Sequence, residues 1–432
     1  MIMHTGQLVF AQVMAYLPLK AFSRMVAARR AQHKVQDFSC LDQFLVLAFA
    51  QLTTRESLRD IEINLRAQRK HFYHMGLRCK TVSRNTLANA NRVRPWEVFA
   101  DLAHHLIRTA RTLYANEPSS SELVSLMGAT VYALDSTTID LCLSIFNWAP
   151  FRTTKAAIKL HTLIDLKGSI PSFIHISDGK MHDVKVLDIL CEQGYIEAGA
   201  FYVMDKAYVD FARLYTLHMA KAFFVTRAKT NMQVAMVQSF PVATNTGLIS
   251  DHHVRLAGVL TAARYPEPIR LVTFFDRETG NTFEFLTNNL TLPANTICAL
   301  YKQRWQVELF FKWIKQHLRI KAFYGNTENA VKTQIWIAIA TYVSIAIMKK
   351  RLNLKHSLYE ILRVLDLNMF EMTPIEALLG KPVEPTELSD YPVQQDLFPR
   401  VRHQMTQVIY LYRGEFYFAT TKGSIAHFGS AF

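Results

Sequence analysis

Three acidic residues stand where their carboxylates could work together. Asp135 follows the apolar run 130–134, Asp205 follows the apolar run 200–204, and Glu308 lies within a long helical pattern. Carboxylates are the hard oxygen ligands that Mg²⁺ prefers, and two such ions about 3.5–4 Å apart can catalyse in-line phosphoryl transfer. Two aspartates on strands and a glutamate on a helix therefore predict a metal-dependent phosphoryl-transfer site.

Each acid also has an ordinary structural interpretation. An aspartate after a strand commonly caps a turn or the following helix, and a glutamate between basic residues on a helix commonly faces solvent. Asp140, Asp165 and Asp183 are alternative acids in the same part of the chain. Only a convergence of the first three acids in space favours the catalytic interpretation.

The glutamate lies in residues 300–322, a segment without Gly or Pro that we expect to form one helix. At about 100° per residue, four polar residues of this helix fall within roughly 60° of one another. They are Tyr301, Arg304, Glu308 and Lys315. Another side of the helix is apolar and forms the expected core face, with Val307, Phe310, Ile314 and Leu318. Glu308 is therefore expected at the edge of the core, flanked by cations.

The segments around the two aspartates predict an α/β domain. Strands are expected at 130–134, 156–165 and 170–177, then a helix, a strand at 200–204, a helix and a strand at 222–226. Lys167-Gly168 is expected to form the hairpin turn between the second and third strands. Both aspartates follow the C-terminal end of a strand, the edge at which open α/β sheets place their sites. They become neighbours if the first and fourth of these strands are adjacent and parallel.

The composition points to a folded protein with a polyanionic partner. Half of the 432 residues are apolar and 19% are charged, which excludes a disordered chain and suggests two or three domains. The formal net charge is +14, and residues 1–115 hold 17 Lys and Arg against 7 Asp and Glu. Nucleic acid fits this excess better than anionic lipid, because the chain has no lipidation motif and no strong basic amphipathic helix.

Cysteine usage and hydropathy favour a cytoplasmic protein. The five cysteines are scattered without a CxxC pair, which disfavours a zinc site and disulfides and fits a reducing cytosol. The start of the chain lacks the pattern of a signal peptide. The longest uncharged apolar run, Ile335–Met348, has 14 residues, fewer than the roughly 20 that span a bilayer. We therefore expect a buried core helix there and no membrane partner.

Residues 1–115 have a helical pattern. Thr53 and Glu56 form a candidate capping box, and Ser83 is expected to cap a short helix. Helix, turn and short helix in a basic region fit a helix-turn-helix DNA reader, although any small helical bundle offers the same pattern. The residues of the short helix that could contact bases or phosphates are Arg84, Asn85 and Arg92.

From Asp135 to the region of Gly325, the chain resembles the catalytic domain of bacterial insertion-sequence transposases of the DDE type. It is most similar to the branch marked by Tyr-x2-Arg-x3-Glu-x6-Lys, whose spacing is matched at every position by Tyr301, Arg304, Glu308 and Lys315. The segment YALDSTT resembles the first motif at Asp135. The segment DKAY resembles the second at Asp205, with the aromatic residue one place earlier than the family pattern. Arg227 and Lys229 resemble a basic pair that follows the next strand.

The resemblance implies an α/β fold: a ribonuclease H-like catalytic domain with a β-rich insert, plus an α-helical N-terminal DNA-binding domain. Residues 1–115 would be the DNA-binding domain, separated by a linker at 116–121 from the first catalytic part, 122–230. The insert would cover 231–295, the catalytic and closing helices 296–370, and a segment of unknown role 371–432.

The resemblance also implies a set of roles and partners. Asp135, Asp205 and Glu308 would hold two Mg²⁺ ions, which Mn²⁺ can replace, while Tyr301, Arg304 and Lys315 would hold DNA phosphates, together with Arg227 and Lys229. The partners would be double-stranded DNA, both terminal inverted repeats and target, and a second subunit in a homodimeric synaptic complex. Cleavage and strand transfer by a cut-and-paste route would take place at the bacterial nucleoid.

Two alternatives stay open at the level of the sequence. One is a nuclease of the same fold that cuts DNA without joining it. The other is a non-enzymatic DNA-binding protein, including a decayed transposase. The sequence does not determine the inverted repeat, the target preference or the cleavage intermediate, hairpin or other.

Overall fold

The longest apolar run of the chain lies within α13 (Glu328–Arg351), a helix at the centre of the fold. Thr327 caps its start by accepting a hydrogen bond from the Ala330 amide, and three cations occupy its last turn. Among the described residues, this is the one helix long and apolar enough to cross a bilayer, but 94% of its most apolar window is buried. The prediction of a core helix is therefore confirmed.

The computed structural model describes residues 6–33, 35–115, 128–153, 155–243, 246–277, 279–317, 323–380, 408–412, 415–419 and 425–430. The predicted linker at 116–121 lies outside these ranges. Residues up to Gly380 form one compact unit and the residues from Lys381 onward a second.

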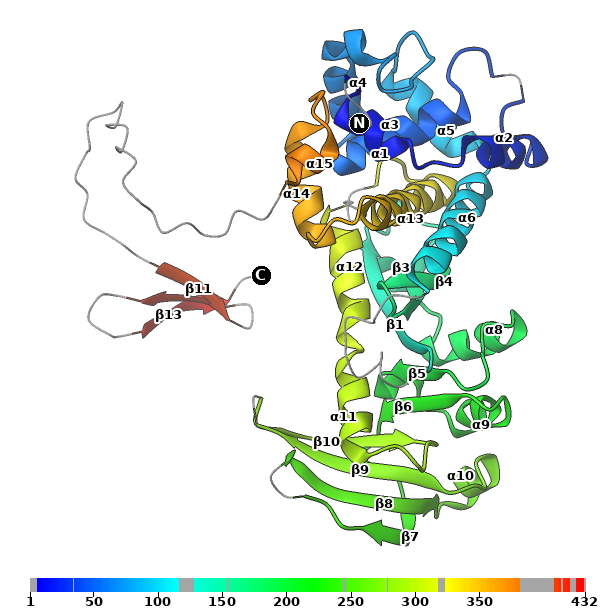
Figure 1. The fold of residues 1–432 in the computed structure, drawn as a ribbon, viewed down its shortest axis with the longest axis vertical. Helices are drawn as coiled ribbons and strands as arrows, with labels where there is room; N and C mark the ends of the chain where they lie inside the picture. Colours follow the sequence, from blue (N-terminus) through cyan, green and yellow to red (C-terminus); the bar gives the residue numbers. More distant parts are fainter. Residues whose placement is uncertain are drawn as a thin grey trace. The chain divides into compact units, whose positions relative to one another are not determined.

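Helices from both ends of the first unit pack around α13. The N-terminal helices are α1 (Val9–Met14), α2 (Leu19–Ala28), α3 (Cys40–Leu52), α4 (Leu58–Ala67), η1 (Arg69–His71), α5 (Arg84–Val93) and α6 (Glu97–Tyr114). The closing helices are α14 (Leu358–Asn368) and α15 (Ile375–Leu378). Because α1, α3, α5, α6 and α14 all contact α13, the N-terminal and closing helices share one core (Figure 1).

One of the two predicted helix starts in the N-terminal region is correct. Ser83 caps α5, since its side chain accepts a hydrogen bond from the Thr86 amide at 3.1 Å. The capping box at Thr53 is wrong, because Thr53 ends α3 and both its amide and its hydroxyl bond to the Phe49 carbonyl. Ser57 caps α4 instead, through the Asp60 amide.

The sheet contains the strands predicted for the α/β domain. These are β1 (Val131–Leu141), β3 (Lys155–Asp165), β4 (Ile170–Asp178), β5 (Phe201–Met204) and β6 (Phe223–Arg227), with a short extra strand, β2 (Pro150–Arg152). Helices α8 (Val186–Glu192) and α9 (Phe211–Met219) follow β4 and β5. Strands β1, β5 and β6 run parallel, and β3 and β4 add antiparallel strands. The predicted order of strands and helices is therefore confirmed.

The position of Asp135 within its strand differs from the prediction. Strand β1 pairs with β5 only from Val131 to Leu134, but it continues to Leu141 because β3 pairs with it along its length. Asp135 therefore lies inside β1, at the point where the parallel partner ends. Asp205 follows β5 directly, as predicted.

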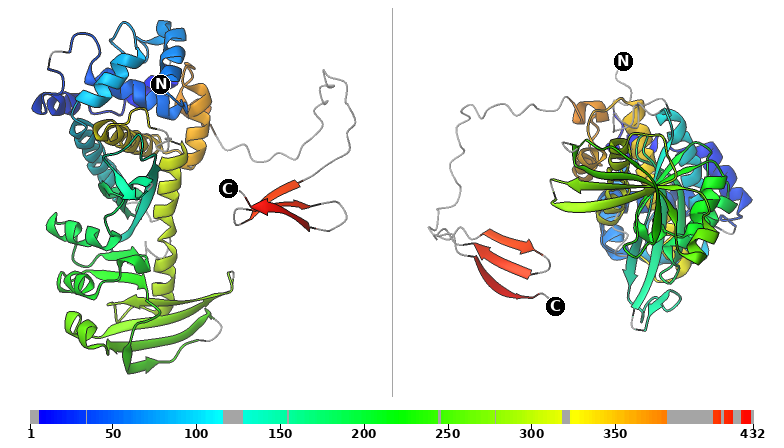
Figure 2. Two further views of the ribbon diagram at one scale, coloured as in Figure 1. Left: turned by 180° about the vertical axis from the view of Figure 1, so that it is seen from behind. Right: turned by 90° about the horizontal axis from the view of Figure 1, so that it is seen from below.

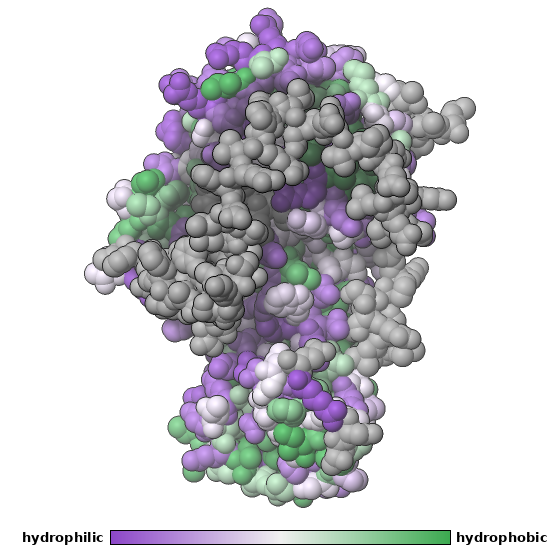
Figure 3. Space-filling model, turned by 90° about the vertical axis from the view of Figure 1, so that its left-hand side faces the viewer, coloured by the Kyte–Doolittle hydropathy of each residue, from purple (hydrophilic) through white to green (hydrophobic). Residues whose placement is uncertain are grey.

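Residues 231–295, predicted to be β-rich, extend the same sheet. They form β7 (Val234–Phe240), β8 (Leu248–Leu256), β9 (Ile269–Asp276), β10 (Asn281–Thr287) and the short helix α10 (Val259–Arg264). Strand β10 pairs antiparallel with β6, so the order runs β2-β3-β1-β5-β6-β10-β9-β8-β7 (Figure 2). Hydrophobic side chains gather on the surface at the end of the first unit that contains β7–β10 (Figure 3). Met236 and Val237 of the edge strand β7 are exposed.

The single helix expected over residues 300–322 is divided. Helix α11 (Ala294–Lys302) ends before Gln303, and α12 (Trp305–His317) begins after Arg304. Residues 318–322, including Leu318 of the predicted core face, lie outside the described ranges. Val307, Phe310 and Ile314 are buried as predicted.

The second unit contains three antiparallel strands. They are β11 (Val408–Tyr412), β12 (Glu415–Ala419) and β13 (Ile425–Ser430), in that order across the sheet. The domain boundaries drawn from the sequence stay predictions.

Candidate active site

The alternation of side chains along β1 and β5 decides which way the two aspartates point. Val131 and Ala133 belong to the core that contains α12 and α13, whereas Tyr132 and Leu134 pack with α8 and α9. Successive residues of a strand face opposite sides, so Asp135 faces the α12 side. The same alternation applies to β5, where Val203 and then Asp205 share that side. Because Leu134 pairs with Met204 in parallel register, the two aspartates lie next to each other.

The turn between α11 and α12 places the third acid opposite them. Its backbone bonds join residues three apart, from Arg304 to Tyr301 at 3.0 Å and from Val307 to Arg304 at 3.1 Å. Side chains three apart nearly eclipse each other in this tighter winding, and the Arg304 guanidinium lies 5.8 Å from the centre of the Tyr301 ring. The side chains that follow the turn therefore project from α12 toward β1.

Arg304 joins two of the acids directly. Its Nη1 donates to Asp135 Oδ2 at 2.9 Å, and its Nη2 donates to Glu308 Oε1 at 2.5 Å. The Tyr301 hydroxyl donates to Asp205 Oδ1 at 3.4 Å. The motif residues of one helical segment thus reach acids on two different strands. Asp135, Asp205 and Glu308 form one cluster, although they are far apart in the sequence.

The cluster is electrostatically coupled. Burial raises the pKa of Asp135 to about 6, opposed by the Ser136 amide and the Arg304 guanidinium and reinforced by the charges of Glu308 and Asp205. Burial also raises the pKa of Tyr301, so its hydroxyl stays protonated and able to donate at neutral pH. Arg304 therefore supplies the positive charge that lets these acids ionise side by side.

The donor set of this cluster fits a divalent cation. Three carboxylates provide hard oxygen ligands, and the guanidinium between two of them shows that they gather around positive charge. Among the described residues, no group of three or more His, Cys, Asp or Glu side chains is spaced to hold a metal ion as it stands. Arg304 lies between Asp135 and Glu308, so metal binding requires this side chain to move.

The other predicted basic residues make contacts within the protein. Lys315 donates to the Thr138 carbonyl of β1 at 2.7 Å, farther along the strand from Asp135. Lys229 donates to the Val209 carbonyl at 2.8 Å, and the Arg227 guanidinium lies 5.2 Å from the centre of the Phe283 ring. Lys315 therefore contacts the strand that carries Asp135, whereas Arg227 ends β6 and Lys229 follows it.

The predicted DNA-contacting residues of the N-terminal region form a separate group. Arg84, Asn85 and Arg92 are all exposed on α5, while Leu87 and Ala90 of the same helix are buried. This helix packs against α4 and α13, so its polar side is left facing solvent. The structure does not bring these three residues into the cluster of acids.

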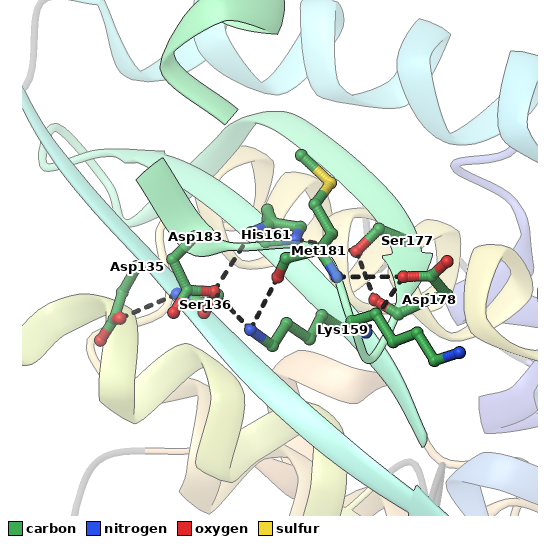
Figure 4. Close-up of polar contacts among 9 residues, drawn as sticks. Asp135, Ser136, Lys159, His161, Ser177, Asp178, Met181 and Asp183 are labelled. Carbon is green, nitrogen blue, oxygen red and sulfur yellow. Dashed lines mark hydrogen bonds and ion pairs between the residues drawn. The ribbon is translucent and has the colours of Figure 1, made fainter. Parts of the chain in front are cut away.

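A second polar cluster lies on the opposite side of β1 and was not predicted. Ser136 donates to Asp183 Oδ1 at 2.7 Å, and Lys159 pairs with the same oxygen at 3.0 Å (Figure 4). His161 is buried beside them, and burial lowers its pKa to about 4, so it is neutral. The sequence signal for this cluster was the spacing of Lys159 and His161 in β3. Residues two positions apart on a strand face the same side, so these two polar side chains must lie together.

The alternative acids have partners of their own. Asp183 belongs to the Lys159 cluster, and Asp165 lies 3.6 Å from Arg111, with its pKa raised by burial. Asp140 is exposed near the end of β1. None of the three contacts Arg304 in the described structure, so Asp135, Asp205 and Glu308 stay the candidate acids.

Comparison with known proteins identifies relatives along most of the chain. Residues 127–344 match the family described as the transposase DDE domain, and residues 5–78 match a domain of unknown function. A protein of Sinorhizobium fredii named as the transposase y4zB is 36% identical over 307 residues, covering 68% of this chain and 80% of that one. A Geobacillus stearothermophilus protein named as the transposase for insertion sequence element IS5377 is 32% identical, covering 49% of this chain and 54% of that one.

More distant similarities concern two further proteins. A Synechocystis protein named for insertion sequence element IS4SA is 24% identical over 330 residues, covering 76% of this chain and 88% of that one. The cryo-EM structure of a piggyBac transposase synaptic complex with hairpin DNA aligns with 87% of this chain and 80% of that chain. The alignment has a TM-score of 0.44 and 11% identity.

Proposed function

Because this chain belongs to the DDE transposases of bacterial insertion sequences, which are metal-dependent enzymes that cleave DNA and transfer strands by phosphoryl transfer, we propose that Asp135, Asp205 and Glu308 are its catalytic acids. The observation that carries this proposal is the pair of bonds from Arg304 to Asp135 and Glu308. They join the first and third acids across 173 positions of the sequence. The contact of Tyr301 with Asp205 adds the second acid.

The three acids would hold two Mg²⁺ ions, which Mn²⁺ could replace. When bound, such ions activate the attacking oxygen and stabilise the leaving oxygen of the in-line displacement. The contribution of the chain is to keep the acids ionised and on rigid elements. Asp135 pairs with β3, directly after the residues of β1 that also pair with β5, and Glu308 is on a helix packed on the core. Arg304 neutralises Asp135 and Glu308 before the metal binds.

The basic and aromatic residues of the motif then hold DNA. Released from the acids, Arg304 can form a two-pronged contact with a phosphate, as guanidinium groups do. The Tyr301 hydroxyl orients Asp205, and Lys315 binds the neighbouring part of the DNA backbone. Arg227 and Lys229 bind DNA phosphates farther along the edge of the sheet. The match of Tyr301, Arg304 and Lys315 to the Tyr-x2-Arg-x3-Glu-x6-Lys pattern supports their part of this assignment.

The substrate is double-stranded DNA that carries the terminal inverted repeats of the element. The basic side of α5, with Arg84, Asn85 and Arg92, contributes to repeat binding, and the excised end joins target DNA by a cut-and-paste route. Two ends must be held together, so the working form is a homodimer in a synaptic complex, acting at the nucleoid of the bacterial cytoplasm. The net charge of +14 supports a DNA partner.

A coupled cleavage and joining assay tests the proposal. Purified protein, Mg²⁺, a labelled end fragment and a plasmid are incubated, and cleaved and joined products are separated by electrophoresis. Asp135→Asn, Asp205→Asn and Glu308→Gln should each abolish both products while DNA binding persists. Asp140→Asn, at an exposed residue of the same strand, is the matched control.

The outcomes separate the alternatives. Full activity in all three variants rejects the site. Cleavage without joining by the wild-type protein favours a nuclease, and binding without cleavage favours a DNA-binding protein.

A further inference from the structure

A large cavity lies beside α12, away from the acids. Its volume is about 810 Å³, within the range of ligand-binding pockets. It is enclosed by α12, the end of α13, the start of α14 and the turn between β3 and β4. None of Asp135, Asp205, Tyr301, Arg304 or Glu308 lines it. The cavity is therefore a site separate from the one described above.

The lining of this cavity is strongly positive. It includes four cations, Lys312, Lys349, Lys350 and Arg363, and no Asp or Glu among the described lining residues. Lys349 and Lys350 stand in the last turn of α13, where cations complement the helix dipole. The dipole of α13 does not explain Lys312 of α12 or Arg363 of α14, which line the same cavity from other helices. The convergence of charge from three helices points to an anionic ligand.

Aromatic side chains give the cavity rigid apolar walls. The Tyr342 ring meets Trp313 edge to face at 4.4 Å and Phe310 at 5.1 Å between ring centres, and all three side chains are largely buried. At the rim, Tyr359 is 50% exposed, and the Arg363 guanidinium lies 5.6 Å from the centre of its ring. A flat aromatic and cationic surface of this kind suits the stacking of a nucleic-acid base.

We propose that this cavity binds a single strand of DNA, with a base held against Tyr359 and the apolar wall and the phosphates held by the four cations. A duplex is a convex cylinder and would touch only the rim, whereas an unpaired strand can enter the cavity. Grooves that combine positive charge with aromatic surfaces are the usual sites for single strands. The inference rests on the proposed function, because it takes DNA as the partner.

The cavity and the acids share α12. Glu308 projects from one side of this helix, and Leu309, Lys312 and Trp313 line the cavity from another. A strand freed by cleavage can therefore be held on the same rigid element that carries the third acid. Cutting one strand of a duplex creates an end from which bases can unpair, and the unpaired end can then enter the cavity.

The test measures the binding of a fluorescent oligothymidylate and of an end-fragment duplex by anisotropy over a salt series, using the full chain. Lys312→Ala and Arg363→Ala should each weaken single-strand binding and lower the slope of log affinity against log salt by about 0.7. Tyr359→Ala should weaken it by about 5- to 100-fold, and Tyr359→Phe should retain it, because the ring supplies the stacking. Duplex binding should change by less than about twofold, because the duplex binds mainly elsewhere.

Matched controls isolate the cavity. Lys221→Ala removes an exposed cation from the turn after α9, and Leu367→Ala removes a side chain that is 85% exposed on α14, the helix of Tyr359 and Arg363. Neither lines the cavity, so both should bind like the wild type. Unchanged single-strand binding in all cavity variants overturns the inference, as does an equal loss of duplex binding. Failure of the wild type to bind any DNA would instead reject the proposed function.

Discussion

Arg304 bonds to both Asp135 and Glu308 and holds the two carboxylates close together. Two carboxylates at close range repel each other, and the guanidinium offsets that repulsion with bonds of 2.9 and 2.5 Å. If these oxygens bind metal as proposed, Arg304 would compete for them. Its release would then couple metal binding to the freeing of a cation for DNA.

Removing Arg304 should change the response to metal. Arg304→Ala should lower the melting temperature without metal, because Asp135 and Glu308 lose their shared partner. Mg²⁺ or Mn²⁺ should then raise the melting temperature of the variant more than that of the wild type, because no guanidinium competes. Thermal unfolding with and without metal measures both effects.

Arg213→Ala is the control for this comparison. Arg213 of α9 pairs with Asp188 of α8 at 2.8 Å, away from Asp135 and Glu308. The shift in melting temperature that metal causes in Arg213→Ala should equal the shift in the wild type. Equal shifts in all three proteins would contradict the competition.

The raised pKa of Asp135 predicts a pH dependence of stability in the metal-free protein. Between its ordinary value of 3.8 and about 6, the folded state binds more protons than the unfolded state. The free energy of unfolding therefore falls as pH rises through this window. Asp135→Asn removes the ionisation, so its stability relative to the wild type should rise between pH 4 and pH 7. Each unit of pKa is about 1.4 kcal/mol, so the gain is on the order of 3 kcal/mol at most.

Urea unfolding at several pH values measures this gain. A difference between variant and wild type that stays constant from pH 4 to pH 7 would reject burial of the Asp135 charge. The same ionisation should govern metal affinity, which is expected to fall below about pH 6 as Asp135 takes up a proton.

At the scale of elements, two turns decide where the site residues lie. The tight turn at Gln303 and Arg304 divides the helix expected over residues 300–322, and it stacks Arg304 against Tyr301. The turn between β3 and β4 packs against α6, since a Cβ at Gly168 would lie 2.3 Å from the Tyr114 ring. The second turn fixes the hairpin beside the helical core.

Gly168→Ala should destabilise the fold through this close approach. Gly168 has φ of +77° and Gly199 has φ of +81°, so Ala is strained at both positions, but nothing lies within 4 Å of a Cβ at Gly199. The difference between the two variants isolates the clash with Tyr114. We expect Gly168→Ala to cost about 1–3 kcal/mol more than Gly199→Ala, measured by urea unfolding. Equal losses of stability in the two variants would mean that the turn can move away from α6 and so avoid the clash with Tyr114.

At the scale of the whole molecule, the helical region is not an independent module. Its helices and the closing helices pack on α13, and α6 also contacts β4. DNA held by α5 would therefore be held by the same core that supports α12. If α5 binds the inverted repeats as proposed, this shared packing would link repeat binding to the position of Glu308.

The proposed contact of α5 with DNA should be visible in the salt dependence of the affinity for DNA. Arg84→Ala and Arg92→Ala should each lower the slope of log affinity against log salt by about 1, because each phosphate contact releases a counterion. Arg264→Ala, which removes an exposed cation of α10, is the control and should leave the slope unchanged. Slopes equal to that of the wild type in the two α5 variants would remove this helix from the interface.

The sequence by itself determined much of the local structure and the candidate chemistry. The apolar run within α13 specified a core helix, Ser83 specified the start of α5, and the residues before Asp135 and Asp205 specified strands. These features depend on periodicity and capping, which act between near neighbours in the chain. The order of strands and helices followed from the same signals.

Only the tertiary structure decided which distant segments meet. The pairing of β1 with β5 set the two aspartates side by side, and the i to i−3 bonds at Arg304 directed that side chain to both Asp135 and Glu308. The spacing of Lys159 and His161 shows only that they share a face. The contact of Lys159 with Asp183 and the continuation of the sheet by β10 depend on the tertiary structure. Strand pairing and helix packing depend on the burial of surface across the whole chain. A local sequence pattern therefore does not predict which strands pair or which helices pack together.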